Sequence, residues 1–171
     1  SISTKSEIKW FSLYSYCVTL FQISQDWSYK RATETLAYII ESTDNIRLKN
    51  MSRATLAITY ARLADRDPKN SVKYIECALS EVKRIKLFRP LPEPNILATA
   101  LAAEGYVYKT LGRIDKAIES FTKSVSVNKD NVSCLIGLGD AYVKNNQMKD
   151  AVFVFREAEQ LSPSSGYSSY R

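Results

Sequence analysis

The side chains that could carry chemistry in this 171-residue chain are carboxylates, amines, hydroxyls and three thiols, because the sequence contains no histidine. The absence of histidine excludes Ser-His-Asp and Cys-His catalysis and histidine-based metal sites. Neither GxGxxG nor GxxxxGK[ST] occurs in the chain, which excludes the phosphate-binding loops that these motifs mark. We therefore expect no catalytic, cofactor-binding or metal-binding residues, and we predict that the protein is not an enzyme.

The carboxylates of the C-terminal half lie beside amines at the spacing of ion pairs on a helix. Glu119 and Lys123, four residues apart, are one such pair. Acid and base groups of an active site would instead converge from different parts of the chain. The pattern favours a solvated helix surface, and the carboxylates concerned are Asp115, Glu119, Asp150 and Glu157.

The net charge of +6 is spread along the chain instead of forming a basic tail. The densest basic cluster consists of Lys83, Arg84, Lys86 and Arg89, and we interpret it as a solvated helix face. Nucleic-acid binding would require basic or aromatic residues that recur along a binding groove, and only Tyr106 and Lys109 meet that description. We expect no nucleic-acid partner.

The cysteines and the apolar segments indicate the compartment. Cys17, Cys77 and Cys134 are odd in number and form no CxxC motif, so we expect small buried hydrophobic side chains in the reduced state. Reduced cysteines favour a cytoplasmic location. The longest uncharged apolar stretch, 10–24, is too short and too polar to span a bilayer, so we expect no membrane partner. Because the chain begins with Ser1, we expect a fragment of a longer protein or a processed product.

Small and apolar residues recur at a spacing of 34 residues between the segments 98–131 and 132–165. Each segment predicts two helices, and the first helix of each ends at a residue that tolerates a left-handed backbone, Gly112 or Asn146. A glycine inside each first helix predicts that a neighbouring helix approaches closely. The identical pairs are Leu101 and Leu135, Gly105 and Gly139, Tyr108 and Tyr142, Ala117 and Ala151, and Phe121 and Phe155.

These residues resemble the tetratricopeptide repeat (TPR) family, which has Leu-Gly and Tyr on a first helix and small and aromatic residues on a second. The segment 132–165 matches this pattern nearly throughout. The segment 98–131 departs from it at Glu104, Ser124 and Lys129, where leucine, a small residue and proline are usual.

The resemblance implies an all-α fold, a right-handed α-solenoid (superhelix) of about four antiparallel helix pairs in a single domain, 1–165. Two degenerate pairs are predicted upstream, at 5–43 and 48–87, and the proline-rich segment 89–94 is predicted to link them to the regular repeats. Residues 166–171 are predicted to be a flexible tail.

In this family the first helices line a concave face that binds protein, so the resemblance also implies candidate partner-binding residues. Their side chains are mostly apolar, which predicts a groove for an apolar or amphipathic segment of a partner. The alternative is that they pack against a further helix of the same protein. The predicted groove residues are Met51, Ala54, Ile58, Thr99, Ala102, Tyr106, Lys109, Ser133, Ile136, Asp140 and Val143.

The same resemblance argues against one well-defined class of partner. TPR proteins that bind the acidic C-terminal tail of heat-shock chaperones use Lys, Asn and Arg in the groove. Ala54, Ile58, Thr99 and Ala103 occupy those positions here, so we expect no binding to that tail.

The last predicted helix carries consecutive apolar residues, so apolar side chains point in every direction around it. A terminal repeat normally has a polar capping face. We therefore expect either that further repeats follow or that Val152, Phe153 and Val154 form an end interface, self-association included. Taken together, the sequence predicts a non-catalytic scaffold or adaptor, and the alternative is a peptide-sensing regulatory domain of a transcription factor or signalling protein.

Overall fold

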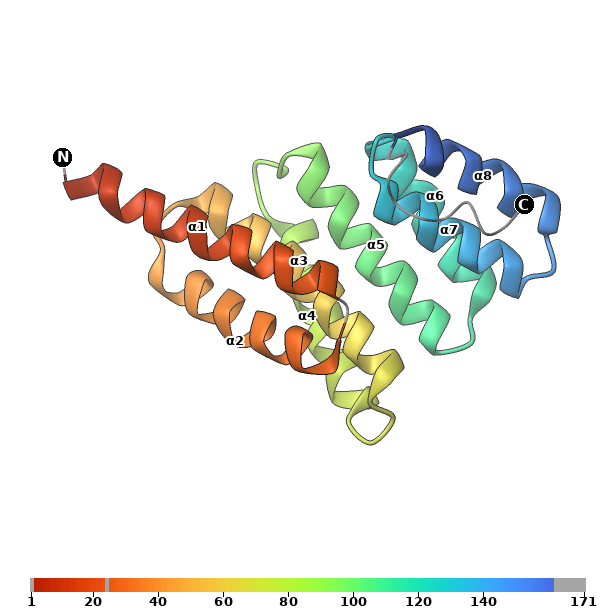
Figure 1. Ribbon diagram of the computed structural model, residues 1–171, viewed down its shortest axis with the longest axis horizontal. Helices are drawn as coiled ribbons and strands as arrows, with labels where there is room; N and C mark the ends of the chain where they lie inside the picture. Colours follow the sequence, from red (N-terminus) through yellow and green to blue (C-terminus); the bar gives the residue numbers. More distant parts are fainter. Residues whose placement is uncertain (1, 24, 162–171) are drawn as a thin grey trace.

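The computed structural model describes residues 2–23 and 25–161, and within these ranges the chain is folded into eight α-helices with no strand. The prediction of an all-α fold is therefore confirmed. The helices are α1 (Ile2–Ile23), α2 (Asp26–Ser42), α3 (Ile46–Arg66), α4 (Ser71–Leu87), α5 (Pro94–Thr110), α6 (Ile114–Val127), α7 (Val132–Lys144) and α8 (Met148–Leu161) (Figure 1).

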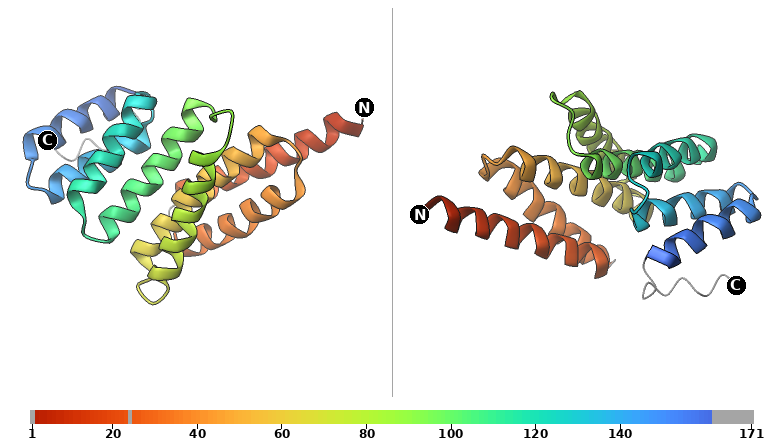
Figure 2. Two further views of the ribbon diagram at one scale, coloured as in Figure 1. Left: turned by 180° about the vertical axis from the view of Figure 1, so that it is seen from behind. Right: turned by 90° about the horizontal axis from the view of Figure 1, so that it is seen from above.

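Consecutive helices pack as hairpins, and each hairpin packs against the next. The first helices of the pairs lie beside one another, because α1 packs on α3, α3 on α5 and α5 on α7. Seen from above, the pairs follow an arc from α1 to α8 (Figure 2). This is the helical solenoid that the repeated pattern predicted.

A proline-containing connection joins the two upstream helix pairs to the regular repeats. The helices of the two upstream pairs extend over 2–42, with residue 24 outside the description, and over 46–87. Residues 88–93, which include Pro90 and Pro92, connect α4 to α5. The predicted flexible tail, 166–171, lies outside the described residues.

Local sequence signals set the ends of the regular helices. The Asn131 side chain accepts a hydrogen bond of 3.2 Å from the backbone N–H of Cys134 and so caps α7. Pro94 is the first residue of α5, where its missing N–H leaves no hydrogen bond unmade. Gly112 and Asn146 adopt positive φ values of 70° and 59° just after α5 and α7, as the stop signals predicted.

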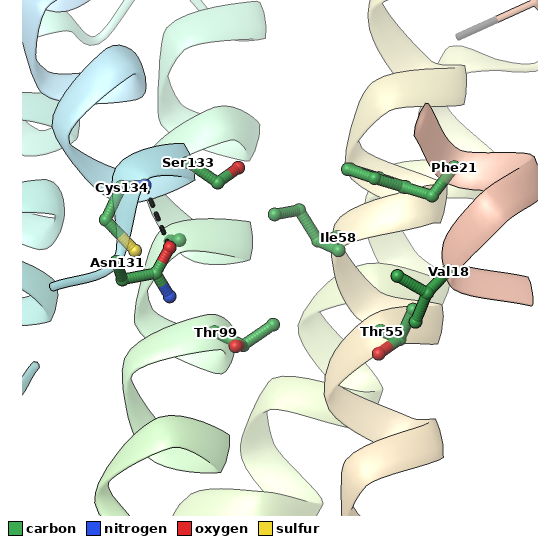
Figure 3. Close-up of a pocket in the computed structure, with 9 residues that line it drawn as sticks. Val18, Phe21, Thr55, Ile58, Thr99, Asn131, Ser133 and Cys134 are labelled. Carbon is green, nitrogen blue, oxygen red and sulfur yellow. Dashed lines mark hydrogen bonds between the residues drawn. The ribbon is translucent and has the colours of Figure 1, made fainter. Parts of the chain in front are cut away.

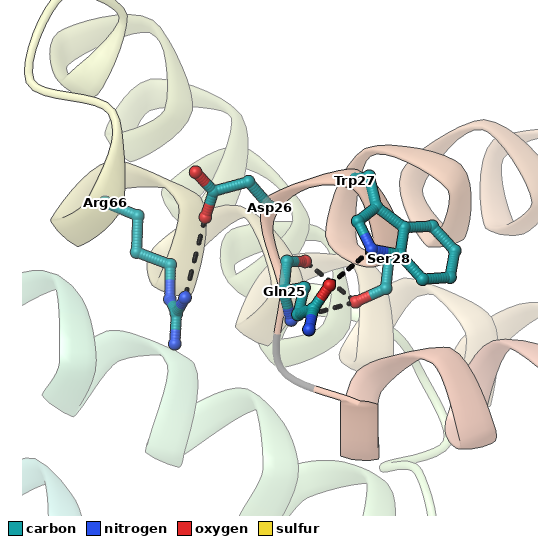
Figure 4. A network of polar contacts seen from close by, with 5 residues as sticks. All are labelled: Gln25, Asp26, Trp27, Ser28 and Arg66. Carbon is teal, nitrogen blue, oxygen red and sulfur yellow. Dashed lines mark hydrogen bonds and ion pairs between the residues drawn. The ribbon is translucent and has the colours of Figure 1, made fainter.

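A small group of polar contacts lies where the start of α2 meets the end of α3 (Figure 4). The Ser28 hydroxyl donates to the backbone oxygen of Gln25 at 2.7 Å and accepts from the N–H of the same residue at 3.1 Å. Arg66 of α3 forms an ion pair with Asp26 at 3.5 Å, and both side chains are exposed. Since exposed pairs contribute little free energy, this contact adds little to the stability of the packing between α2 and α3.

The mid-helix glycines allow the aromatic ring of the second helix to reach the first. A Cβ built on Gly105 would lie 2.9 Å from the ring of Phe121, and one built on Gly139 would lie 2.5 Å from Cε1 of Phe155. Both phenylalanines are buried, so neither ring has free space to move into. The close approach predicted from these glycines is confirmed.

The structure also explains two of the departures from the repeat pattern. Glu104, which replaces a leucine, accepts a hydrogen bond of 2.7 Å from Nζ of Lys86 on α4. Ser124, which stands where a small residue is usual, is fully buried, and its hydroxyl donates to the backbone oxygen of Ala98 at 2.7 Å. Each polar substitution therefore has a partner on an adjacent helix, which offsets the cost of burying it.

Candidate partner-binding groove

A pocket of about 140 Å³ lies on the face formed by the first helices of all four pairs. Its walls come from α1 and α3 on one side and from the start of α7 on the other, with α5 between them (Figure 3). The lining residues are Val18, Phe21, Thr55, Ile58, Thr99, Ala102, Asn131, Ser133 and Cys134. Four of the predicted groove residues, Ile58, Thr99, Ala102 and Ser133, are among them.

Helical periodicity explains why α3 and α5 present these residues together. Thr55 and Ile58 are three residues apart on α3, and Thr99 and Ala102 are three apart on α5, so each pair shares one helix face. Ala102 contributes only a methyl group, whereas Ile58 projects from the opposite side. The pocket therefore arises where small residues of α5 face larger residues of α3.

The contribution of α1 was missed by the sequence analysis. Val18 and Phe21 line the pocket beside α3, and the hydroxyls of Tyr14 and Thr55 lie 3.0 Å apart and tie the two helices together. The predicted helix pair 5–43 contains the apolar stretch 10–24, but none of its residues was predicted to line the groove. The register of this stretch against α3 depends on residues about forty positions away, which no local pattern reveals.

Two of the predicted groove residues, Ala54 and Tyr106, are not among the residues that line the pocket. Ala54 is 1% exposed and Tyr106 is 2% exposed, and both belong to the hydrophobic core. They are buried because α3 and α5 lie directly side by side, so positions between the two axes face the neighbouring helix.

The remaining predicted residues lie outside the pocket lining. Met51 on α3 and Ile136 on α7 are partly exposed and pack against the edge of the core. Val143 and Asp140, also on α7, are partly exposed.

A polar cluster connects three of the first helices next to the pocket. Nη2 of Arg62 on α3 donates to the Tyr106 hydroxyl at 2.6 Å, and the guanidinium lies over the ring with Cζ 3.8 Å from its centroid. The Tyr106 hydroxyl in turn donates to the backbone oxygen of Ser133 at 3.2 Å. Nζ of Lys109 lies 3.3 Å from Oδ2 of Asp140 on α7. The cluster therefore links α3, α5 and α7 through side chains.

Burial changes the proton affinity of two members of this cluster. Burial raises the pKa of Tyr106 to about 12, although the charge of Arg62 acts in the opposite direction. Burial lowers the pKa of Lys109, and the Asp140 carboxylate opposes this effect by favouring the ammonium form. Tyr106 therefore remains a neutral hydroxyl that donates one hydrogen bond and accepts another.

The predicted end interface on α8 is only partly exposed. Val152 is 40% exposed and Phe153 is 64% exposed, but Val154 is buried at 6%. Val154 turns toward the core with Ala151 and Ala158, which lie three residues before it and four after it on the same helix face. The prediction for Val154 is therefore corrected.

The described part of the chain contains no group of three or more His, Cys, Asp or Glu side chains arranged to hold a metal ion. None of the helices in residues 2–23 and 25–161 combines the length and hydropathy needed to cross a membrane. All three cysteines are free thiols.

Comparisons with known proteins identify the repeated segments. Residues 98–131 and 132–165 each match the family model described as tetratricopeptide repeat, which confirms the predicted repeats. Among solved structures, MamA (residues 41 to the end) from Desulfovibrio magneticus RS-1 is similar, with 18% identity and a TM-score of 0.48 over 90% of this chain and 76% of that one. A second MamA structure has 22% identity and a TM-score of 0.45, over 82% of both chains. No curated protein matches the chain.

Proposed function

Because residues 98–131 and 132–165 are tetratricopeptide repeats, we propose that the chain is a non-catalytic scaffold that binds a segment of a partner protein in the pocket between α1, α3, α5 and α7. Repeats of this kind serve protein–protein interaction in general. The observation that carries the specific proposal is the apolar pocket on the face shared by the four first helices.

The size of the pocket supports an apolar side chain as its occupant. A cavity of about 150 Å³ with an apolar lining is large enough to bind benzene. The pocket has about 140 Å³ and is lined by Val18, Phe21, Ile58 and Ala102 together with small polar residues. It therefore suits one leucine, isoleucine or phenylalanine side chain of the partner.

Partly exposed apolar residues around the pocket support a longer contact. Met51 on α3 and Ile136 and Val143 on α7 lie outside the pocket on the first helices and retain some exposure. An amphipathic partner helix places anchors three, four and seven residues apart, so one anchor would fill the pocket while others contact these residues.

The experiment begins with a phage-displayed random peptide library selected on the immobilised protein. The affinity of the enriched peptides is then measured by fluorescence anisotropy for the wild type and for Thr99→Arg, whose long side chain would fill the pocket. We expect at least a tenfold loss of affinity in Thr99→Arg, a change of about 1.4 kcal/mol.

The matched control is Thr33→Arg on α2. The Thr33 hydroxyl donates to the backbone oxygen of Lys30 at 2.7 Å, much as the Thr99 hydroxyl donates to that of Asn95 at 2.8 Å. Because α2 packs against α1 and α3 and not against α5 or α7, this change leaves the pocket intact. Equal affinity of the wild type and Thr99→Arg, or the absence of any enriched peptide, would contradict the proposal.

The regulatory alternative would use the same pocket in a different way. A peptide-sensing domain of a transcription factor or signalling protein binds a free short peptide, whereas a scaffold binds a segment within a larger protein. Retained affinity when a selected peptide is embedded in a folded carrier protein favours the scaffold.

We also propose a second interface at the end of the chain and a cellular location. The exposed Val152 and Phe153 on α8 support self-association or docking of another subunit at this end. The three free cysteines support a cytoplasmic location, where thiols remain reduced.

A further inference from the structure

We infer that the groove selects partner segments in which a carboxylate follows or precedes the apolar anchor by about one helical turn, and that Arg62 binds this carboxylate. The inference rests on the proposed function, because it specifies the chemistry of the segment held in the pocket. Three observations support it: the position of Arg62, its N–H groups that have no acceptor, and its contacts with Tyr106.

Arg62 continues the line of the pocket residues along the same helix face. It follows Ile58 by four residues on α3, which corresponds to about 6 Å along the helix axis. On α5, Tyr106 follows Ala102 by the same interval, and its hydroxyl donates to the backbone oxygen of Ser133, a pocket residue. The guanidinium therefore lies one turn beyond the apolar pocket, on the same side of the solenoid.

The guanidinium has donors that no partner fills. Within residues 2–23 and 25–161, Arg62 forms no ion pair, and its one hydrogen bond is that from Nη2 to the Tyr106 hydroxyl. Nε is shielded from water without a hydrogen-bond partner. Partial burial of a charged group is unfavourable unless the group is paired. A carboxylate bound at the Nη atoms would therefore offset the cost of burying the Arg62 charge.

Arg62 is also held in place before a partner arrives. Stacking on the Tyr106 ring at 3.8 Å and the 2.6 Å hydrogen bond restrict the side chain, so little further rotamer entropy is lost on binding. The planar fork of an arginine fits both oxygens of one carboxylate. A segment that presents a carboxylate there would meet a donor set that is already oriented.

The neighbouring charges leave Arg62 as the cation available to a partner. Lys109 is 9% exposed and already paired with Asp140. Asp65, the other carboxylate that acts on Lys109, is exposed to water, which weakens its field at the groove. The net charge of +6 further favours an acidic segment over a basic one.

The geometry specifies a spacing in the partner. An extended segment advances about 3.3 Å per residue, so a carboxylate two residues from the anchor would reach Arg62. A helical segment would use a spacing of three or four residues. This is a site for a single side-chain carboxylate, because the fork of one guanidinium binds the two oxygens of one carboxylate.

The test uses the peptides enriched on the wild-type protein and changes the peptide first. Each enriched peptide is compared with a copy in which aspartate is replaced by asparagine, or glutamate by glutamine. We expect enriched sequences with an acidic residue at the stated spacing and a loss of affinity of about tenfold or more in the amide copy. Because the protein is unchanged, this comparison does not depend on how a variant folds.

The second arm assigns the effect to Arg62. In Arg62→Gln, the acidic peptide and its amide copy should bind with similar affinity, whereas Lys83→Gln, an exposed change on α4, should leave the difference intact. Circular dichroism and thermal unfolding establish that both variants fold.

The outcomes separate this inference from the proposed function. Apolar peptides that are enriched without acidic residues, and that lose affinity in Thr99→Arg, would overturn the role of Arg62 and leave the groove proposal standing. An acidic preference that persists in Arg62→Gln would place the carboxylate elsewhere and also overturn the inference. No enrichment at all would overturn both.

Discussion

The ring of Phe121 on α6 occupies the space that a side chain on Gly137 of α7 would need. A Cβ built on Gly137 would lie 2.5 Å from Cε1 of Phe121, closer than real contacts allow. The same ring lies against Gly105 on α5 and meets the Tyr106 ring edge-on, with centroids 4.9 Å apart. One buried phenylalanine therefore joins the two regular repeats, and its position depends on two glycines in different repeats.

Gly137→Ala should therefore destabilise the protein although alanine favours helices. Overpacking costs about 1–3 kcal/mol, and the gain in helix propensity is about 0.5–1 kcal/mol, so we expect a net loss of about 1–2 kcal/mol in the free energy of unfolding. Urea denaturation followed by circular dichroism measures this change. Phe121→Leu in the same chain should relieve the contact, so the double variant should be more stable than the sum of the single changes predicts. Strict additivity would contradict this account.

The pair formed by Lys109 and Asp140 should respond unequally to removal of its two partners. Lys109 is 9% exposed, whereas Asp140 is 36% exposed and can be hydrated. Asp140→Asn leaves a buried ammonium group without its carboxylate, and we expect a loss of about 1–2 kcal/mol in the free energy of unfolding. Lys109→Met removes the buried charge and keeps the aliphatic stem, so its effect should be smaller. The denaturant midpoints of the two variants show which one is less stable. A larger loss of stability in Lys109→Met would show that packing of the lysine stem dominates.

The buried cysteines should react slowly with alkylating reagents. Burial raises the pKa of the Cys17 and Cys134 thiols from 9.0 to about 11, although hydrogen bonds act in the opposite direction. A raised thiol pKa means less thiolate at any pH below it, so near pH 8 the reactive fraction should be about 100-fold lower than for an unshifted thiol. Mass spectrometry after timed treatment with iodoacetamide should show Cys77, which is partly exposed, modified first.

Unfolding in urea provides the control for this measurement, because all three thiols should then react at similar rates. Modification of Cys134 at the rate of Cys77 in the folded protein would indicate that the pocket wall opens on the timescale of the reaction.

The exposed end of α8 should support self-association that depends on Phe153. This side chain is 64% exposed beside Val152 at 40%, so a contact between two copies would remove apolar surface from water. Light scattering during size-exclusion chromatography should show a mass that rises with protein concentration. Phe153→Ser should raise the concentration at which half of the protein is self-associated, the association midpoint, about tenfold or more. Ile46→Ser, which changes a residue with 60% exposure on α3, should leave the midpoint unchanged. A wild type that stays monomeric at every concentration would disprove self-association.

Local sequence determined the helices and the repeat. The 34-residue spacing, the stops at Gly112 and Asn146 and the glycine at 105 were sufficient to predict the paired helices of 98–165, because each acts over one or two turns of backbone. The resemblance to the tetratricopeptide repeat family implied Ile58, Thr99, Ala102 and Ser133 as groove residues, and all four line the pocket.

Only the tertiary structure decided which residues of that face remain accessible. Tyr106 and Ala54 share the predicted face but are buried where α3 and α5 adjoin, whereas Val18 and Phe21 of α1 complete the pocket without any signal in the repeat pattern. Periodicity records which residues point in the same direction from one helix axis. What covers them depends on helices brought alongside from distant parts of the chain, and that information lies in the packing between pairs.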